Sequence, residues 1–145
     1  VFVMRSAEAY LIAAEAIVQG ATGGQLGGAS DYYNATVNRA ITGGVLGNAN
    51  MAADPTSLTS LATKSYRASG SVTIDMILDE RAREFMGEGL RWYDLKRTGK
   101  LIERAKAMNP WVGDLNFIQD YHQLRPIPLN EIDLSSNSVI QNPGY

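Results

Sequence analysis

The sequence contains no cysteine and one histidine, which excludes disulfides and sites built on thiolate ligands. His122 has no second histidine or cysteine to join it in a recognisable metal or nucleophile site, and we expect it on the surface or in a loop. Sites for hard cations built from Asp and Glu alone stay open, although no calcium-loop spacing occurs. We therefore expect no cofactor, and no metal site can be named.

Long apolar runs and a strong net charge are also absent. No stretch is apolar for long enough to cross a bilayer, and nothing at the start has the pattern of a signal peptide. The net charge of −2 gives no electrostatic reason to bind nucleic acid or an anionic membrane. The chain starts at Val1 without a methionine, so we interpret it as a fragment whose export signal or anchor lies elsewhere.

What is present is typical of one globular domain. The chain has 145 residues, of which 45% are hydrophobic and 19% charged, enough for a single domain over 1–145 with a core. Small and apolar residues recur at steps of three and four, which predicts an all-α fold. The expected helices span about 4–19, 31–41, 74–85, 90–98 and 100–108, with one further turn at 131–134.

Local signals set the expected ends of these helices. Ser30 and Thr73 are suitable N-caps, and Gly20 and Gly99 follow helices as C-caps. The first two helices are joined by a short glycine-rich connection, so we expect them to pack antiparallel. Residues 43–71, beginning with a glycine pair that should stop the second helix, are expected to form an irregular loop, and the proline-punctuated tail an extended segment.

Charges of both signs are concentrated between residues 79 and 99, around the aromatic pair Trp92 and Tyr93. Arg81 shares a helix face with apolar residues and must be paired if it is buried, because an isolated buried charge is very costly. We therefore predict a structural ion network around packed aromatic rings. Its candidate members are Glu8, Glu15, Glu80, Arg81, Glu84, Glu88, Arg91, Asp94 and Arg97.

The same carboxylates could be considered as catalytic groups. Glu80, Glu84 and Glu88 lie one turn apart, and paired carboxylates hydrolyse glycosides. However, arginines are interleaved with them, and positive neighbours lower a carboxylate pKa whereas a general acid needs a raised one. We favour the ion network and expect no catalytic residue.

Aromatic residues outside the expected helices are candidate ligand contacts. Flat exposed rings stack on sugars because a pyranose presents an apolar C–H face of matching size. Tyr66, Trp111 and Tyr121 are the candidates for such a platform. The alternative, that they fill small satellite cores, stays open for each of them.

Several segments resemble the C-terminal part of SusD/RagB proteins. Residues 5–16 (RSAEAYLIAAEA) and 31–40 (DYYNATVNRA) resemble two consecutive helices of that family. Residues 80–97 (ERAREFMGEGLRWYDLKR) match its charged signature, and 124–128 (LRPIP) and 141–145 (QNPGY) follow in the right order. Together the motifs are specific, and they cover nearly the whole chain outside 43–71.

The resemblance implies a surface lipoprotein of the Gram-negative outer membrane. Such proteins bind oligosaccharides or other nutrients and deliver them to a TonB-dependent, SusC-like transporter. It further implies that helices 4–19 and 31–41 form a tetratricopeptide-like pair and that both the lipid-bearing residue and the N-terminal part of the protein lie outside this chain. The matched residues are scaffold residues, and no ligand-binding residue is carried over.

Two other classes of function stay open. A tetratricopeptide-like module could bind a peptide or the transporter itself, without a glycan site of its own. A hydrolase is disfavoured by the arginines that accompany each carboxylate.

Overall fold

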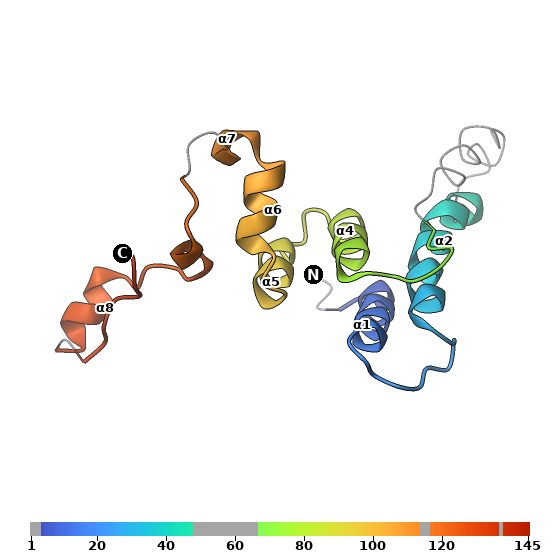
Figure 1. The fold of residues 1–145 in the computed structure, drawn as a ribbon, viewed down its shortest axis with the longest axis horizontal. Helices are drawn as coiled ribbons and strands as arrows, with labels where there is room; N and C mark the ends of the chain where they lie inside the picture. The colour runs from blue at the N-terminus through green and yellow to red at the C-terminus, as the bar shows by residue number, and fades with distance from the viewer. Residues whose placement is uncertain (1–3, 48–66, 114–116, 137) are drawn as a thin grey trace. The chain divides into compact units, whose positions relative to one another are not determined.

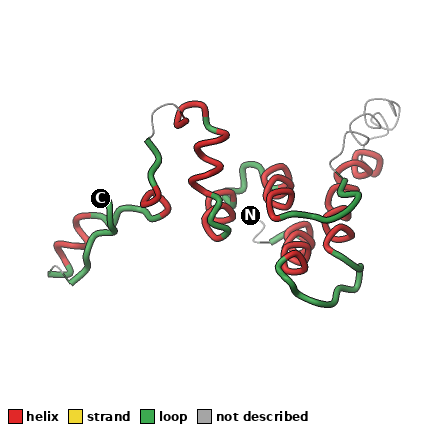
Figure 2. The backbone as a smooth tube through the Cα atoms, in the orientation of Figure 1, coloured by secondary structure: helices red, strands yellow, loops and turns green. Residues whose placement is uncertain are grey.

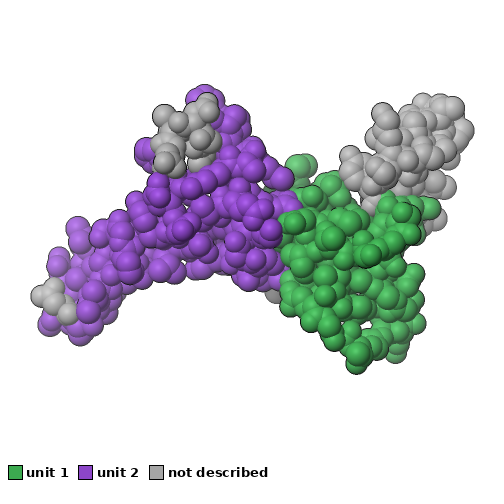
Figure 3. Space-filling view, in the orientation of Figure 1, with its two compact units in different colours: residues 1–88 green, residues 89–145 purple. Residues whose placement is uncertain are grey.

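The computed structural model describes residues 4–47, 67–113, 117–136 and 138–145, and every regular element in these ranges is helical (Figures 1 and 2). The all-α prediction is therefore confirmed. The chain divides into two compact units, Val1–Glu88 and Gly89–Tyr145 (Figure 3). None of the described helices has the length and hydropathy needed to cross a membrane.

Helix α1 (Ser6–Val18) forms because alanines dominate its sequence and leave little side-chain entropy to lose. It ends as predicted at Gly20, which has a φ of 101°. The amide of Gly20 donates to Ile17 O over 3.0 Å and that of Ala21 to Ala16 O over 2.9 Å, the pair of bonds that defines a Schellman motif. Met4, where the expected helix began, precedes the observed helix and is exposed.

Helix α2 (Ala29–Gly47) is longer than predicted at both ends. Ser30 lies inside the helix, so its assignment as the N-cap is wrong. Asp31 Oδ2 instead accepts from the Gly28 amide over 2.8 Å at the start of the helix. The prediction that Gly43 and Gly44 stop the helix is also wrong, because a mid-helix glycine costs only about 1 kcal/mol and does not block the next hydrogen bond. The remainder of the predicted loop, up to residue 66, lies outside the described residues.

Helices α1 and α2 pack against each other in opposite directions. Arg5 at the start of α1 and Arg39 late in α2 both bind Glu84. One turn further along α1, the ring of Tyr10 lies 6.1 Å from that of Tyr32, which is early in α2. Contacting residues therefore have increasing numbers along α1 and decreasing numbers along α2. The two helices form the antiparallel pair expected from the short connection.

Helix α4 (Ile74–Glu84) packs on α1, also in the opposite direction. It begins at the predicted N-cap, where the Thr73 hydroxyl accepts from the Met76 amide over 3.2 Å. Its last turn reaches the start of α1 through Glu84 and Arg5, and the preceding turn pairs Arg81 with Glu8. The core of this unit comprises Ala7, Leu11, Ala14, Tyr33, Val37, Val72, Ile77, Leu78 and Phe85.

The second unit is built from shorter elements. It contains α5 (Arg91–Arg97), α6 (Leu101–Met108), α7 (Pro110–Gly113), a 3-10 turn η1 (Asp120–Gln123) and α8 (Leu129–Leu134). Its core is small, and its buried apolar side chains among the described residues are Leu95, Leu101 and Ile102. Helix α7 and η1 were not expected, and α8 starts at Leu129, two residues before the predicted turn. Proline at the first position of α7 explains why Asn109–Pro110 ends one helix and also begins another.

Candidate functional site

Glu84 connects the three helices of the first unit. Its Oε1 accepts from Arg5 Nη1 over 2.8 Å and from Arg39 Nη2, while Arg5 Nη2 donates to the Glu84 backbone carbonyl over 2.7 Å and to Glu88 Oε1 over 2.6 Å. The Glu84 side chain is only 7% exposed. We call Arg5, Arg39, Glu84 and Glu88 the Glu84 cluster. Its hydrogen bonds, led by that to Glu88, raise the pKa of Arg5.

Phe85 lies between two guanidinium groups. The Arg5 guanidinium carbon is 5.0 Å from the centre of the Phe85 ring and that of Arg81 is 5.1 Å away, both within cation–π range. Arg81 is 4% exposed, and its Nη2 lies 3.4 Å from Glu8 Oε1. Aromatic packing and ion pairing are therefore combined at one point, where α4 meets α1.

A second pair borders the core next to Tyr33. Arg83 Nη2 donates to Glu80 Oε2 over 2.7 Å, and both charges act on the buried Tyr33. Burial, aided by the negative charge of Glu80, raises the pKa of Tyr33 above its ordinary value of 10.0. Glu15 is buried too, and its Oε1 accepts from Gln19 Nε2 over 3.1 Å.

The remaining predicted network residues lie in the second unit. Asp94 is buried and its Oδ1 accepts from Arg97 Nη2 over 3.1 Å. Arg91 is half-buried at the start of α5. Of the aromatic pair that was expected in the core, Trp92 is half-buried with the Arg125 guanidinium 5.4 Å from its ring centre. Tyr93 is exposed, which corrects that expectation.

These contacts leave the carboxylates little scope for chemistry. Oε1 of Glu84 already accepts two guanidinium donors, and the Glu84 side chain is only 7% exposed. Within the four described ranges, no three side chains of His, Asp or Glu gather closely enough to hold a metal ion. The arrangement fixes three helices relative to one another.

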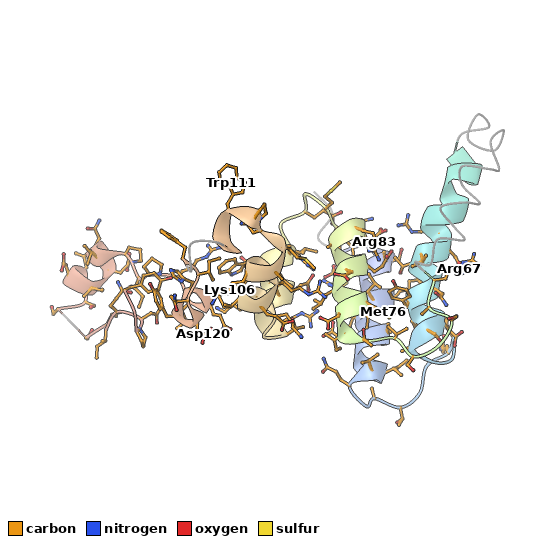
Figure 4. All side chains as sticks on the ribbon, turned by 45° about the horizontal axis from the view of Figure 1, so that its top comes forward. Arg67, Met76, Arg83, Lys106, Trp111 and Asp120 are labelled. Carbon is orange, nitrogen blue, oxygen red and sulfur yellow. The ribbon has the colours of Figure 1, made fainter. Side chains whose placement is uncertain are left out.

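The aromatic candidates have different surroundings. Trp111 is 85% exposed on α7, and Figure 4 shows its indole projecting away from the ribbon. Tyr121 is half-buried, stacked on His122 at 4.1 Å and meeting Tyr145 edge-on at 5.1 Å. Tyr66 lies outside the described residues. Phe117, which is 73% exposed, is a further exposed aromatic ring in the same unit.

Sequence reasoning missed a set of contacts that joins the two motifs of the tail. The Gln141 side chain accepts from the Ile127 amide over 2.7 Å and donates to the Ile127 carbonyl over 2.9 Å. It thus satisfies both backbone groups of Ile127, as the backbone of a neighbouring β-strand would. Asn142 Nδ2 donates to Arg125 O over 2.7 Å, and the Tyr145 hydroxyl donates to Leu124 O over 2.8 Å. No local pattern in the sequence indicates these bonds, because they depend on the chain path that brings residues 124–127 and 141–145 together.

Fold and contacts together define an all-helical scaffold held by arginine–carboxylate pairs. The chain belongs to the SusD family, whose sequence model (SusD_RagB) matches residues 1–145. It is 32% identical over 143 residues to SusD-like protein P2 from Formosa agariphila, a match covering 98% of this chain and 25% of that protein.

Among solved structures, the chain is similar to surface glycan-binding protein A from Bacteroides thetaiotaomicron. The TM-score is 0.64 with 29% identity, over 97% of this chain and 24% of that one. This chain therefore spans about a quarter of the length of either relative.

Proposed function

We propose that the protein containing this chain binds an oligosaccharide, or another nutrient, at the cell surface and delivers it to a TonB-dependent, SusC-like transporter. Membership of the SusD family supports this, as does likeness to a protein named for surface glycan binding. On the same grounds we propose that the protein lies at the outer membrane, held by a lipid on a residue outside this chain.

In this proposal the role is binding, without catalysis. The observation that carries this is the state of the charged signature, whose most central carboxylate, that of Glu84, is on a side chain only 7% exposed and is bound by two arginines. A carboxylate that acts on a glycosidic bond must lie within reach of the sugar oxygen. The signature therefore serves to position helices, and the ligand must be bound by other residues.

Trp111 is the residue of this chain that we propose to contact the ligand. Its indole is exposed and projects from a short helix, and its amide donates to Asn109 Oδ1 over 3.0 Å, which fixes the local turn. An exposed indole presents a large flat face to the C–H surface of a sugar ring at low entropic cost. Tyr121 is a weaker candidate because His122 and Tyr145 already occupy much of its surface.

The test is affinity electrophoresis of the full-length protein through gels that contain a panel of polysaccharides. We expect retardation by at least one polysaccharide and a loss of roughly 1 kcal/mol or more of binding free energy in Trp111→Ala, as for an aromatic contact. Tyr93→Ala, which removes another exposed ring, is the matched control and should bind normally. Retardation of Trp111→Ala equal to that of the wild type would remove Trp111 from the site.

A further inference from the structure

The orientation of Trp111 is set by its backbone more than by packing around its ring. The residue is 85% exposed, and the indole projects from the ribbon of α7 (Figure 4). Neighbouring side chains therefore restrict the ring little. Where the indole points depends first on where the backbone places its Cα–Cβ bond, and then on two side-chain torsions.

The two residues before Trp111 constrain that backbone. Asn109 ends α6, since its amide donates to Ala105 O over 3.1 Å, and its φ of −103° and ψ of 104° are extended. Proline disfavours helical geometry in the residue that precedes it, which agrees with these angles. The ring of Pro110 then fixes its own φ near the helical value at the first position of α7. The chain thus turns between the two helices at a defined point.

The Asn109 side chain adds a further constraint. Pro110 has no amide hydrogen, so Trp111 supplies the first backbone donor of α7, and Asn109 Oδ1 accepts from it over 3.0 Å. This is the bond that an N-cap residue makes to the second residue of a helix, and asparagine suits it well. It ties the Trp111 backbone to the end of α6, which is anchored in the core by Leu101 and Ile102.

We propose that Asn109 is a positioning residue for the ligand, acting through Trp111; the inference rests on the proposed function, in which Trp111 contacts a sugar ring. With Asn109 Oδ1 in place, binding has to order only the indole torsions. Without it, binding must order the backbone of α7 as well, and that entropic cost lowers the affinity. In this arrangement Asn109 contacts no ligand atom.

The experiment measures dissociation constants by affinity electrophoresis of the full-length protein through a polysaccharide that retards the wild type. Asn109→Ala should raise the dissociation constant about three- to tenfold, the range expected when a contact residue loses its preorganisation. Asn109→Asp and Asn109→Ser retain a capping oxygen and should bind within about twofold of the wild type. In a Trp111→Ala background, Asn109→Ala should weaken binding by less than about twofold further, because two residues that act as a unit are not additive.

The control for loss of a helix cap is Thr73→Ala, which removes the side-chain acceptor at the start of α4. It should lower the melting temperature and leave the dissociation constant unchanged.

Three results would overturn the inference, and they differ in what else they change. Wild-type affinity of Asn109→Ala, with binding lost in Trp111→Ala, would overturn the role of Asn109 and leave the Trp111 contact in place. Equal losses in all three variants at position 109, or a full further loss without Trp111, would show that Asn109 does not act through Trp111. Wild-type affinity of Trp111→Ala would remove the contact itself and this inference with it.

Discussion

Single residues in this chain carry more than one structural role, and Phe85 shows this best. Its ring is buried and contacted by the guanidinium groups of Arg5 and Arg81. Arg5 also binds Glu84, the residue next to Phe85. Delocalised guanidinium groups are weakly hydrated and stack on aromatic rings. Lysine could therefore not replace either arginine at this site without a loss of stability.

Replacing Arg81 should therefore destabilise the protein. Arg81→Ala leaves Glu8 without this partner and removes the packing on Phe85, so we expect the free energy of unfolding to fall by about 3 kcal/mol. The measurement is urea denaturation of the full-length protein followed by circular dichroism. Arg67→Ala, at an exposed arginine, is the control and should change stability by less than about 0.5 kcal/mol. A negligible effect of Arg81→Ala would show that the burial of this charge contributes nothing.

Tyr33 should make stability depend on pH at the alkaline end. Its pKa is raised in the folded protein, by burial first and then by Glu80, so the folded state binds this proton more tightly than the unfolded state does. Its contribution is fully present below the unfolded pKa of 10.0 and is lost as the pH rises through the folded pKa. Urea midpoints measured from pH 8 to pH 11 should fall less steeply above pH 10 in Tyr33→Phe than in the wild type. Parallel curves would contradict this.

At the scale of elements, capping patterns in the sequence predicted those helix ends where a side chain or a glycine allows the terminal backbone groups to form hydrogen bonds. Thr73 caps α4 and Gly20 ends α1 as expected. The rules failed for α2, which continues through Gly43 and Gly44 because low helix propensity is only a weak prior. They also missed η1, whose capping box is made by Gln119 and His122, residues with little intrinsic signal for such a role.

The end of α5 offers a test of one of these rules. Gly99 has a φ of 69°, and the Lys100 amide donates to Leu95 O over 2.8 Å to complete a Schellman motif. A Cβ at this position would meet no atom within 4 Å, so the cost of Gly99→Ala is the backbone strain alone, about 1 kcal/mol.

The matched control is Gly70→Ala, where the backbone is not left-handed and the space is equally open. Replacing that glycine should leave stability unchanged or raise it by about 0.5 kcal/mol, since it restricts the unfolded chain. The melting temperature of Gly99→Ala should therefore be lower than that of the wild type, whereas that of Gly70→Ala should be equal to it or higher. The reverse order would show that the Schellman geometry is not required.

At the scale of the whole molecule, the sequence predicted the class of fold and the family but could not predict the pairing of charges. That Arg81 needs a partner follows from its helix face, whereas the choice of Glu8 follows from the antiparallel packing of α1 and α4. Exposure also depends on tertiary structure, which is why Trp111 and Tyr121 were equivalent in the sequence and differ in the structure. The tail contacts of Gln141 and Asn142 required the chain path itself.

The central claim is that the Glu84 cluster is architecture and takes no part in ligand chemistry. The most direct test is Glu84→Gln in the full-length protein. Two quantities are measured: the melting temperature, and the affinity for a polysaccharide that retards the wild type in affinity electrophoresis. The affinity is measured well below the melting temperature. We predict a fall in stability of about 1–3 kcal/mol, because two arginines lose their charged acceptor, together with an unchanged dissociation constant. An unchanged melting temperature with lost binding, or with lost release of sugar from the polysaccharide, would contradict the account.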